Sequence, residues 1–140
     1  MRQAGWVDLS NAAGTIHLPA GTVSLLGTDD AHIHRDRVGA PASSWVEPGV
    51  LRLGVTHAPY TRVVSALTSA GSDLILAGHT HGMQLKIGSF SPSEWFYPEW
   101  GGPYYEGERA LYVSLGAGEV LLPFRIGAWP EINLITLKHH

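Results

Sequence analysis

Residues 73–82 read DLILAGHTHG, and this stretch decides the fold. A short apolar run ends in two histidines between glycines, which is typical of a buried strand that leads into a tight turn. Residues 51–59, LRLGVTHAP, show the same pattern, since a second apolar strand is followed by His57 at its carboxyl end. Apolar residues at helical spacing between the two strands predict one helix over about residues 60–70, closed by Gly71. The pattern therefore predicts two parallel strands joined by a right-handed crossover.

The composition of the 140-residue chain indicates a folded, strand-rich domain. Hydrophobic residues make up 44% and charged residues 15%, which argues against disorder and permits a buried core. Seventeen glycines and nine prolines favour many turns over a helix bundle. A net charge of −3 without a basic stripe gives no indication of nucleic-acid binding, and no apolar run is long enough for a membrane segment. Because cysteine is absent, any metal must be held by nitrogen and oxygen ligands.

The rest of the chain is predicted to form mainly strands and turns. Residues 15–18 and 23–27 flank a glycine-containing turn and predict a hairpin, followed by a polar loop over 28–36 and a Pro/Ser stretch to Gly49. Residues 2–6 are typical of the last turn of a helix that is stopped by glycine. Further strands are predicted at 83–87, 110–115, 120–122 and 132–137, with an irregular segment over 89–107.

Three histidines at strand ends indicate a metal site. In extended backbone, His79 and His81 would point to the same face about 7 Å apart, close enough to chelate one ion or to straddle two. His57 would join them, because the functional crevice of an α/β sheet lies beyond the carboxyl ends of its strands. Neutral imidazole suits Zn, Mn, Fe or Ni. The alternative is that all three are ordinary loop histidines bonded to backbone groups.

The polar loop after the hairpin holds further candidates. His32 and His34, beside Asp29, Asp30 and Asp36, could form a second metal cluster, line the rim of an active site, or belong to a plain surface loop. Asp29 follows the end of a strand, so it is the carboxylate best placed to orient a ligand imidazole.

Other side chains of interest have simpler interpretations. His17 is predicted to be a solvent-facing strand residue. The aromatic residues within 95–105 could cover an apolar substrate or anchor an irregular loop to the body of the domain. His139 and His140 are either natural sequence or the remnant of a purification tag, and they are not counted as candidates.

Residues 76–84, LAGHTHGMQ, preceded by VTHAP at 55–59, closely resemble the calcineurin-like metallophosphoesterases, whose bacterial branch carries the signature AGHTHGGQ. GTDD at 27–30 and the closing segment 130–137 resemble the same branch, and Met83 stands where that branch usually has glycine. The resemblance implies an α/β sandwich of two mixed sheets. It also implies a dinuclear centre of Mn, Fe or Zn that hydrolyses phosphomonoesters or phosphodiesters through a metal-bound hydroxide.

The resemblance also assigns residues to the centre. His57 and His79 would bind one ion and His81 the other, with Asp29, Asp30 and Thr80 at the rim or behind the ligands. The family's earlier blocks, in order an Asp-x-His, a Gly-Asp and a Gly-Asn-His-Asp/Glu, do not occur as a series in this sequence. The expectation is therefore a single partial domain over residues 1–140, the C-terminal half of such a sandwich, without an assigned catalytic residue.

This expectation has consequences for activity. The parent protein would be a hydrolase with a phosphate-ester substrate, while the isolated chain would be inactive and at most partly occupied by metal. An alternative is a non-catalytic remnant of the fold that binds one ion or dimerises through exposed sheet edges. A third interpretation is a purely structural module, in which none of the three histidines has a functional role.

Overall fold

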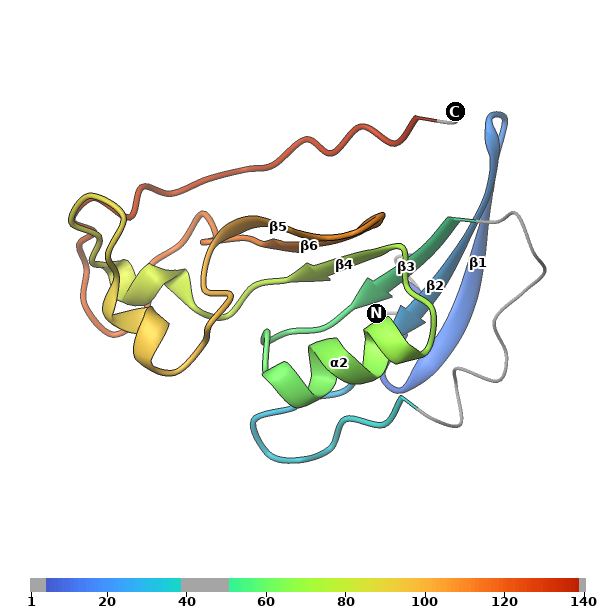
Figure 1. The fold of residues 1–140 in the computed structure, drawn as a ribbon, viewed down its shortest axis with the longest axis horizontal. Coiled ribbons are helices and arrows are strands. Elements are labelled where there is room, and N and C mark those ends of the chain that lie inside the picture. The colour runs from blue at the N-terminus through green and yellow to red at the C-terminus, as the bar shows by residue number, and fades with distance from the viewer. Residues whose placement is uncertain (1–4, 39–50, 139–140) are drawn as a thin grey trace.

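The computed structural model describes residues 5–38 and 51–138, which form a six-stranded mixed sheet with one α-helix within those ranges (Figure 1). The strands lie in the order β1-β2-β3-β4-β6-β5 across the sheet. Their bounds are β1 Ala12–Leu18, β2 Gly21–Gly27, β3 Leu51–Val55, β4 Leu74–Ala77, β5 Gly102–Glu106 and β6 Arg109–Val113. The predicted class, a strand-rich mixed α/β sheet with one clear helix, is confirmed.

The centre of the sheet is parallel and its two edges are antiparallel. Strands β2, β3, β4 and β6 pair in parallel, so their carboxyl ends lie at the same end of the sheet. Strand β1 is antiparallel to β2, which confirms the hairpin, and β5 is antiparallel to β6. The parallel pairing of β3 and β4 confirms the predicted strand–helix–strand unit.

The helix α2, Thr61–Ser69, confirms the helix predicted at about 60–70 and packs on one face of the sheet (Figure 1). Val63 and Leu67 lie four residues apart on its inner face and are fully buried. Gly54 on β3 faces this side of the sheet, where a Cβ would lie 3.4 Å from Leu67 Cδ1 and 2.8 Å from Ser72 Oγ just after the helix. The core on this side consists of Leu26, Ala31, Val38, Val63, Leu67, Ile75, Ala77, Leu111 and Val113.

The opposite face of the sheet is apolar and only half-buried. Leucine side chains on neighbouring strands lie side by side on this face, because the register pairs Leu25 with Leu53 and Leu53 with Leu74. The C-terminal segment runs along this side, where the Asn133 side chain accepts a 2.6 Å hydrogen bond from the Tyr112 hydroxyl (Figure 1). No helix within residues 5–38 and 51–138 combines the length and hydropathy needed to cross a membrane.

Four sequence predictions about secondary structure are wrong. Residues 83–87 are not a strand. The 3₁₀-helix η2, His81–Gln84, extends into this segment, and only isolated bridges at Leu85 and Ile87 follow it. The segment 89–107 is more ordered than predicted, since it holds η3 Pro92–Trp95 and β5.

The segments 120–122 and 132–137 also lack strand pairing in the described part of the chain. The reason at 120–122 is that the Gln84 side chain, rather than a neighbouring strand, binds the backbone amide of Val120. In the C-terminal segment Ile132 and Leu134 are almost fully exposed. The predicted helix turn at 2–6 falls largely outside the described residues. The Pro/Ser stretch beyond residue 38, His139 and His140 also lie outside them.

Candidate metal centre

His57 and His79 meet just beyond the carboxyl ends of the neighbouring parallel strands β3 and β4. The backbone amide of Gly78 donates a 2.9 Å hydrogen bond to the carbonyl oxygen of His57, which extends the pairing of the two strands past their ends. The side chains then converge, with His57 Nε2 lying 2.9 Å from His79 Nδ1 and the rings edge to face at 4.7 Å between centroids.

The backbone after β4 turns left-handed instead of staying extended. His79, His81, Gly82, Met83 and Gln84 have φ values of 70°, 50°, 59°, 44° and 57°. Non-glycine residues adopt this region rarely and at a cost, and such residues cluster at functional sites. The prediction that His79 and His81 share one strand face is therefore wrong.

His81 lies against the segment 115–128. Its Nδ1 lies 3.0 Å from Nη2 of Arg125, and a Cβ on Gly116 would lie 3.6 Å from its Cε1. Arg125 also donates to the backbone carbonyls of Leu115, Gly118 and Ala128. Arg125 carried no signal in the sequence, because it lies 44 residues from its histidine partner.

The fit to a metal ion is therefore partial. Two nitrogens bound at about 2.0–2.1 Å to neighbouring positions of one ion lie about 2.9–3.4 Å apart, so the His57–His79 separation suits two ligands of a single ion. Among the residues that the structure describes, no three His, Asp or Glu side chains gather closely enough to hold an ion. His57 and His79 supply two of the ligands that one ion would need. His81 contacts Arg125 instead.

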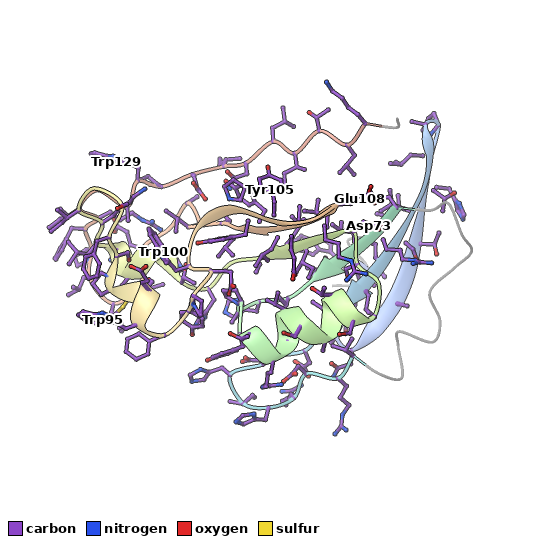
Figure 2. The ribbon with its side chains drawn as sticks, in the orientation of Figure 1. Asp73, Trp95, Trp100, Tyr105, Glu108 and Trp129 are labelled. Atoms are coloured by element: carbon purple, nitrogen blue, oxygen red, sulfur yellow. The ribbon has the colours of Figure 1, made fainter. Side chains whose placement is uncertain are left out.

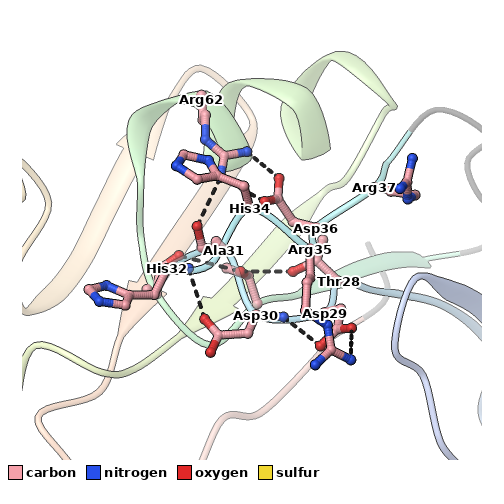
Figure 3. Close-up of polar contacts among 12 residues, drawn as sticks. Thr28, Asp29, Asp30, Ala31, His32, His34, Arg35, Asp36, Arg37 and Arg62 are labelled. Carbon is pink, nitrogen blue, oxygen red and sulfur yellow. Dashed lines mark hydrogen bonds and ion pairs between the residues drawn. The ribbon is translucent and has the colours of Figure 1, made fainter.

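The polar loop 28–38 is tied to the N-terminal end of α2 and to itself (Figure 3). Arg62 on α2 forms an ion pair with Asp36 and donates 2.9 Å to the carbonyl of Ala31. Asp29 pairs with Arg35 at 2.6 Å and accepts from the amide of Asp30. The carboxylate of Asp29 is thus engaged by loop groups.

His32 and His34 diverge within this loop. His34 Nδ1 lies 3.4 Å from Arg62 Nη2, while His32 Nδ1 lies 2.8 Å from the hydroxyl of Tyr60. The amide of His32 donates to Asp30 Oδ1 at 2.8 Å. The loop therefore brings His32 and Asp30, but not His34, toward the histidine pair.

An aromatic network adjoins the histidine pair. Tyr97 contacts His79 edge to face at 5.7 Å and Tyr60 at 5.3 Å between centroids, and its hydroxyl donates to that of Tyr60. The ring of His32 lies 6.2 Å from that of His79. Tyr60 was not singled out in the sequence, because a tyrosine before a helix carries no distinctive signal.

Thr80, predicted at the rim, is a buried structural residue between the two histidines. Its hydroxyl donates a 2.6 Å hydrogen bond to the carbonyl of Trp100 and accepts a longer one from the amide of Gly82. Trp100 lies with Trp95 and Trp129 at the end of the molecule beyond β4 and β6 (Figure 2). Thr80 thus fastens the turn to this tryptophan-rich end.

Burial favours the neutral form of His79 and of His81. The pKa of His79 is lowered from 6.5, first by burial and then by His57 and His32. Burial and then the Arg125 guanidinium lower the pKa of His81. Burial and the hydrogen bond to Tyr60 raise the pKa of Tyr97, so its hydroxyl stays protonated. Neutral imidazole is the form that binds metals.

These features define an α/β protein with an imidazole pair at the carboxyl ends of adjacent parallel strands. The chain is 31% identical to phosphodiesterase YaeI of Escherichia coli over 98% of its length, and 26% identical to the uncharacterized metallophosphoesterase YkoQ of Bacillus subtilis over 95%. It is 30% identical to the uncharacterized protein YpbG of Bacillus subtilis over 95% of its length. The names of these relatives support the calcineurin-like metallophosphoesterase family for the chain.

The chain spans about half the length of these curated relatives, 49% of YaeI, 50% of YkoQ and 49% of YpbG. No family model and no solved structure matches it.

Proposed function

We propose that this chain is part of a metal-dependent phosphoesterase that hydrolyses phosphomonoesters or phosphodiesters. The observation that carries the proposal is the 2.9 Å separation of His57 Nε2 and His79 Nδ1 at the ends of β3 and β4. YaeI is named a phosphodiesterase and YkoQ a metallophosphoesterase, which supports the same reaction class. Two divalent ions, Mn, Fe or Zn, would polarise the phosphoryl oxygens and supply a hydroxide near neutral pH.

The ligands proposed from this chain are three histidines. His57 and His79 would hold one ion, and His81 would contribute to the other. Asp30 would lie at the rim, a role supported by its electrostatic interaction with His79 and by the hydrogen bond that it accepts from the His32 amide. Asp29 and Thr80 support the loop and the turn that carry these groups.

We further propose that residues 1–140 form the C-terminal half of the domain and do not complete the centre alone. Two findings support this: the chain spans about half the length of its relatives, and no three ligands gather among the described residues. Carboxylates that bridge the two ions would come from the remainder of the protein. The isolated chain is expected to bind metal weakly and to show no metal-dependent turnover.

The test is a calorimetric titration of the chain with Mn²⁺ and Zn²⁺, together with a bis-p-nitrophenyl phosphate assay. His57→Gln and His79→Gln should each weaken metal binding about tenfold or more, because each removes one of two converging ligands. His17→Gln, on the exposed β1 strand, is the matched control and should bind like the wild type. Metal binding that survives both substitutions would disprove the ligand pair, and robust turnover by the wild-type chain would disprove its incompleteness.

A second candidate function is that of a non-catalytic, self-associating remnant of the fold. It is favoured by the half-buried apolar face that includes Leu25, Leu53 and Leu74, and by the edge strands β1 and β5. Light scattering and metal analysis on the same sample separate the two readings. About two ions per pair of chains with phosphoesterase activity indicates a reassembled enzyme, whereas one Zn without activity indicates the remnant.

A further inference from the structure

A cavity of about 410 Å³ lies between α2 and the β5–β6 hairpin, on the face of the sheet that the helix covers. Its walls come from four elements, with Val64 on α2, Ile75 on β4, Tyr104 on β5 and Leu111 on β6. None of the residues that line it was assigned to the metal centre. Its volume is typical of a small-ligand site. We propose that this cavity is a second binding site, independent of the proposed function, for a small molecule that carries a primary ammonium group.

Glu99 determines which charge the cavity favours. The other charged side chains of the lining, Glu106 and Arg109, stand opposite each other in the register of β5 and β6, so their charges offset one another at the rim. Glu99 lies outside this pair, in the segment before β5. Its Oε2 is covered from solvent and has no hydrogen-bond partner within the described part of the chain. The lining therefore carries a net negative charge, which attracts a cation.

The hydroxyl of Ser72 is a second, independent indication of a ligand. Ser72 lines the cavity where the chain passes from α2 to β4, and it is 1% exposed. Its Oγ also has no hydrogen-bond partner among the residues that the structure describes. Buried hydroxyl and carboxylate oxygens are normally paired, because leaving them without a partner is unfavourable. Two such oxygens in residues of one lining indicate that donors enter this cavity from outside the chain.

The walls of the cavity do not supply these donors. The hydroxyl of Tyr104 donates a 3.2 Å hydrogen bond to the carbonyl of Gly101, so its proton is already used. The side chains of Val64, Ile75 and Leu111 are apolar and can only pack against an aliphatic stem. In the free chain both unpaired oxygens are covered, so a donor reaches them only when the neighbouring side chains move apart slightly.

A primary alkylammonium ion matches this lining better than other ligands. Its head group has three N–H donors and no acceptor, and it is compact enough to enter between side chains. Its alkyl stem would lie on the apolar wall. An anion would be repelled by Glu99, and a quaternary ammonium has no N–H to donate. A metal ion lacks ligands, since no three His, Asp or Glu side chains gather among the described residues.

The test is an NMR titration of the ¹⁵N-labelled 140-residue chain with n-butylammonium chloride at pH 7. The backbone amides of Ser72, Glu99 and Leu111 should shift together and saturate. Three comparison ligands should each bind about tenfold or more weakly: n-butanol lacks the charge, tetramethylammonium lacks the N–H donors, and butyrate has the opposite charge. Nα-acetyl-lysine methylamide should also bind more weakly, because its two backbone amides must fit at the rim. Tighter binding of this blocked lysine would overturn the small-molecule ligand in favour of a protein side chain.

Variants of the two unpaired groups complete the test. Glu99→Gln should weaken n-butylammonium binding about tenfold, and Ser72→Ala about threefold. Neither substitution removes a hydrogen bond that the free chain makes, so both variants should fold, and their spectra report this directly. Glu119→Gln removes the same charge from an exposed position outside the cavity and is the matched control, which should bind like the wild type.

Three outcomes would overturn the proposal. The first is the absence of saturable shifts with n-butylammonium. The second is equal binding of n-butanol, which would mean that apolar packing alone fills the cavity. The third is a Glu99→Gln variant that binds as tightly as the wild type. Each of them leaves the proposed His57–His79 ligand pair untouched, because neither histidine lines this cavity.

Discussion

The hydroxyl of Thr80 donates a 2.6 Å hydrogen bond to the carbonyl oxygen of Trp100, and both residues are buried. Thr80 stands between His79 and His81, so this single bond fixes the turn that presents both imidazoles. Trp100 in turn packs with Leu115 and Ala128 in a small second core. The geometry of the histidines thus depends on a contact 20 residues away in the sequence.

Replacing Thr80 with valine tests this dependence. Valine has nearly the same shape but leaves the buried Trp100 carbonyl without a partner, which costs about 1–3 kcal/mol of unfolding free energy. Urea denaturation should show this loss, and Thr80→Ser, which keeps the hydroxyl, should recover most of it. Equal stability of the valine and serine variants would show that the hydroxyl is not what fastens the turn.

Gly54 on β3 should not tolerate a side chain. A Cβ there would lie 2.8 Å from Ser72 Oγ and 3.3 Å from Ile75 Cγ1, so alanine requires these two buried side chains to shift. Overpacking of this kind costs about 1–3 kcal/mol. Thermal unfolding of Gly54→Ala should show the loss, while Gly118→Ala, where a Cβ meets nothing within 4 Å, is the control and should unfold near the wild-type temperature.

Met83 should be better replaced by glycine. Its φ of 44° is left-handed, and 51% of its surface is exposed, so the side chain contributes little burial to offset the strain. Glycine would relieve about 1–2 kcal/mol of backbone strain in the folded chain. This gain exceeds the roughly 0.5–1 kcal/mol by which the greater conformational freedom of unfolded glycine lowers the free energy of unfolding. Met83→Gly should therefore gain about 0.5–1 kcal/mol in denaturant titrations, whereas Met83→Leu should gain nothing. A destabilised glycine variant would mean that Met83 makes contacts that matter more than its backbone.

The metal-free chain should lose stability as the pH falls below about 6.5. Burial lowers the pKa of His79 and His81 below their ordinary 6.5, so between the folded and unfolded values the unfolded chain binds more protons. The free energy of unfolding therefore rises with pH through this window, and the contribution of the two histidines is fully present above pH 6.5. The lowered pKa of Asp36, caused first by Arg62, acts separately, because its contribution is lost only below 3.8.

The measurement is the urea midpoint at pH 7.5 and 5.5. His79→Gln should reduce the difference between the two midpoints, and His17→Gln, which removes an exposed histidine, should preserve it. A midpoint that stays constant, or rises, as the wild type is acidified would contradict the direction of both histidine shifts.

The elements that the sequence could predict are those with a local pattern. The apolar runs that end at His57 and His79, and the helical spacing of Val63 and Leu67 between them, produced β3, α2 and β4 as expected. The hairpin followed from its turn. Strand ends then placed two histidines together, because parallel pairing brings carboxyl ends to one side.

The parts that sequence reasoning missed depend on distant partners. Gln84 looked like a strand residue, but its amide donates to the carbonyls of Leu122 and Phe124, 38 and 40 residues away. These bonds hold residues 120–124 as a loop instead of a strand. Arg125 similarly redirects His81 from 44 residues away. No periodicity encodes such pairs, so the left-handed turn at 79–84 could not be foreseen.

The hydrogen bond from Gly78 to the carbonyl of His57 gives the histidine pair a mechanical property. The backbones of His57 and His79 are joined by the continuous hydrogen-bond ladder of β3 and β4. These backbones cannot separate unless the pairing of the two strands opens. A larger or smaller ion would have to be accommodated by side-chain torsions alone. If the pair binds an ion as proposed, its preference for an ion of a given radius would depend on the rigidity of the two strands as well as on the side-chain torsions, and selectivity could be altered from the sheet without touching either histidine.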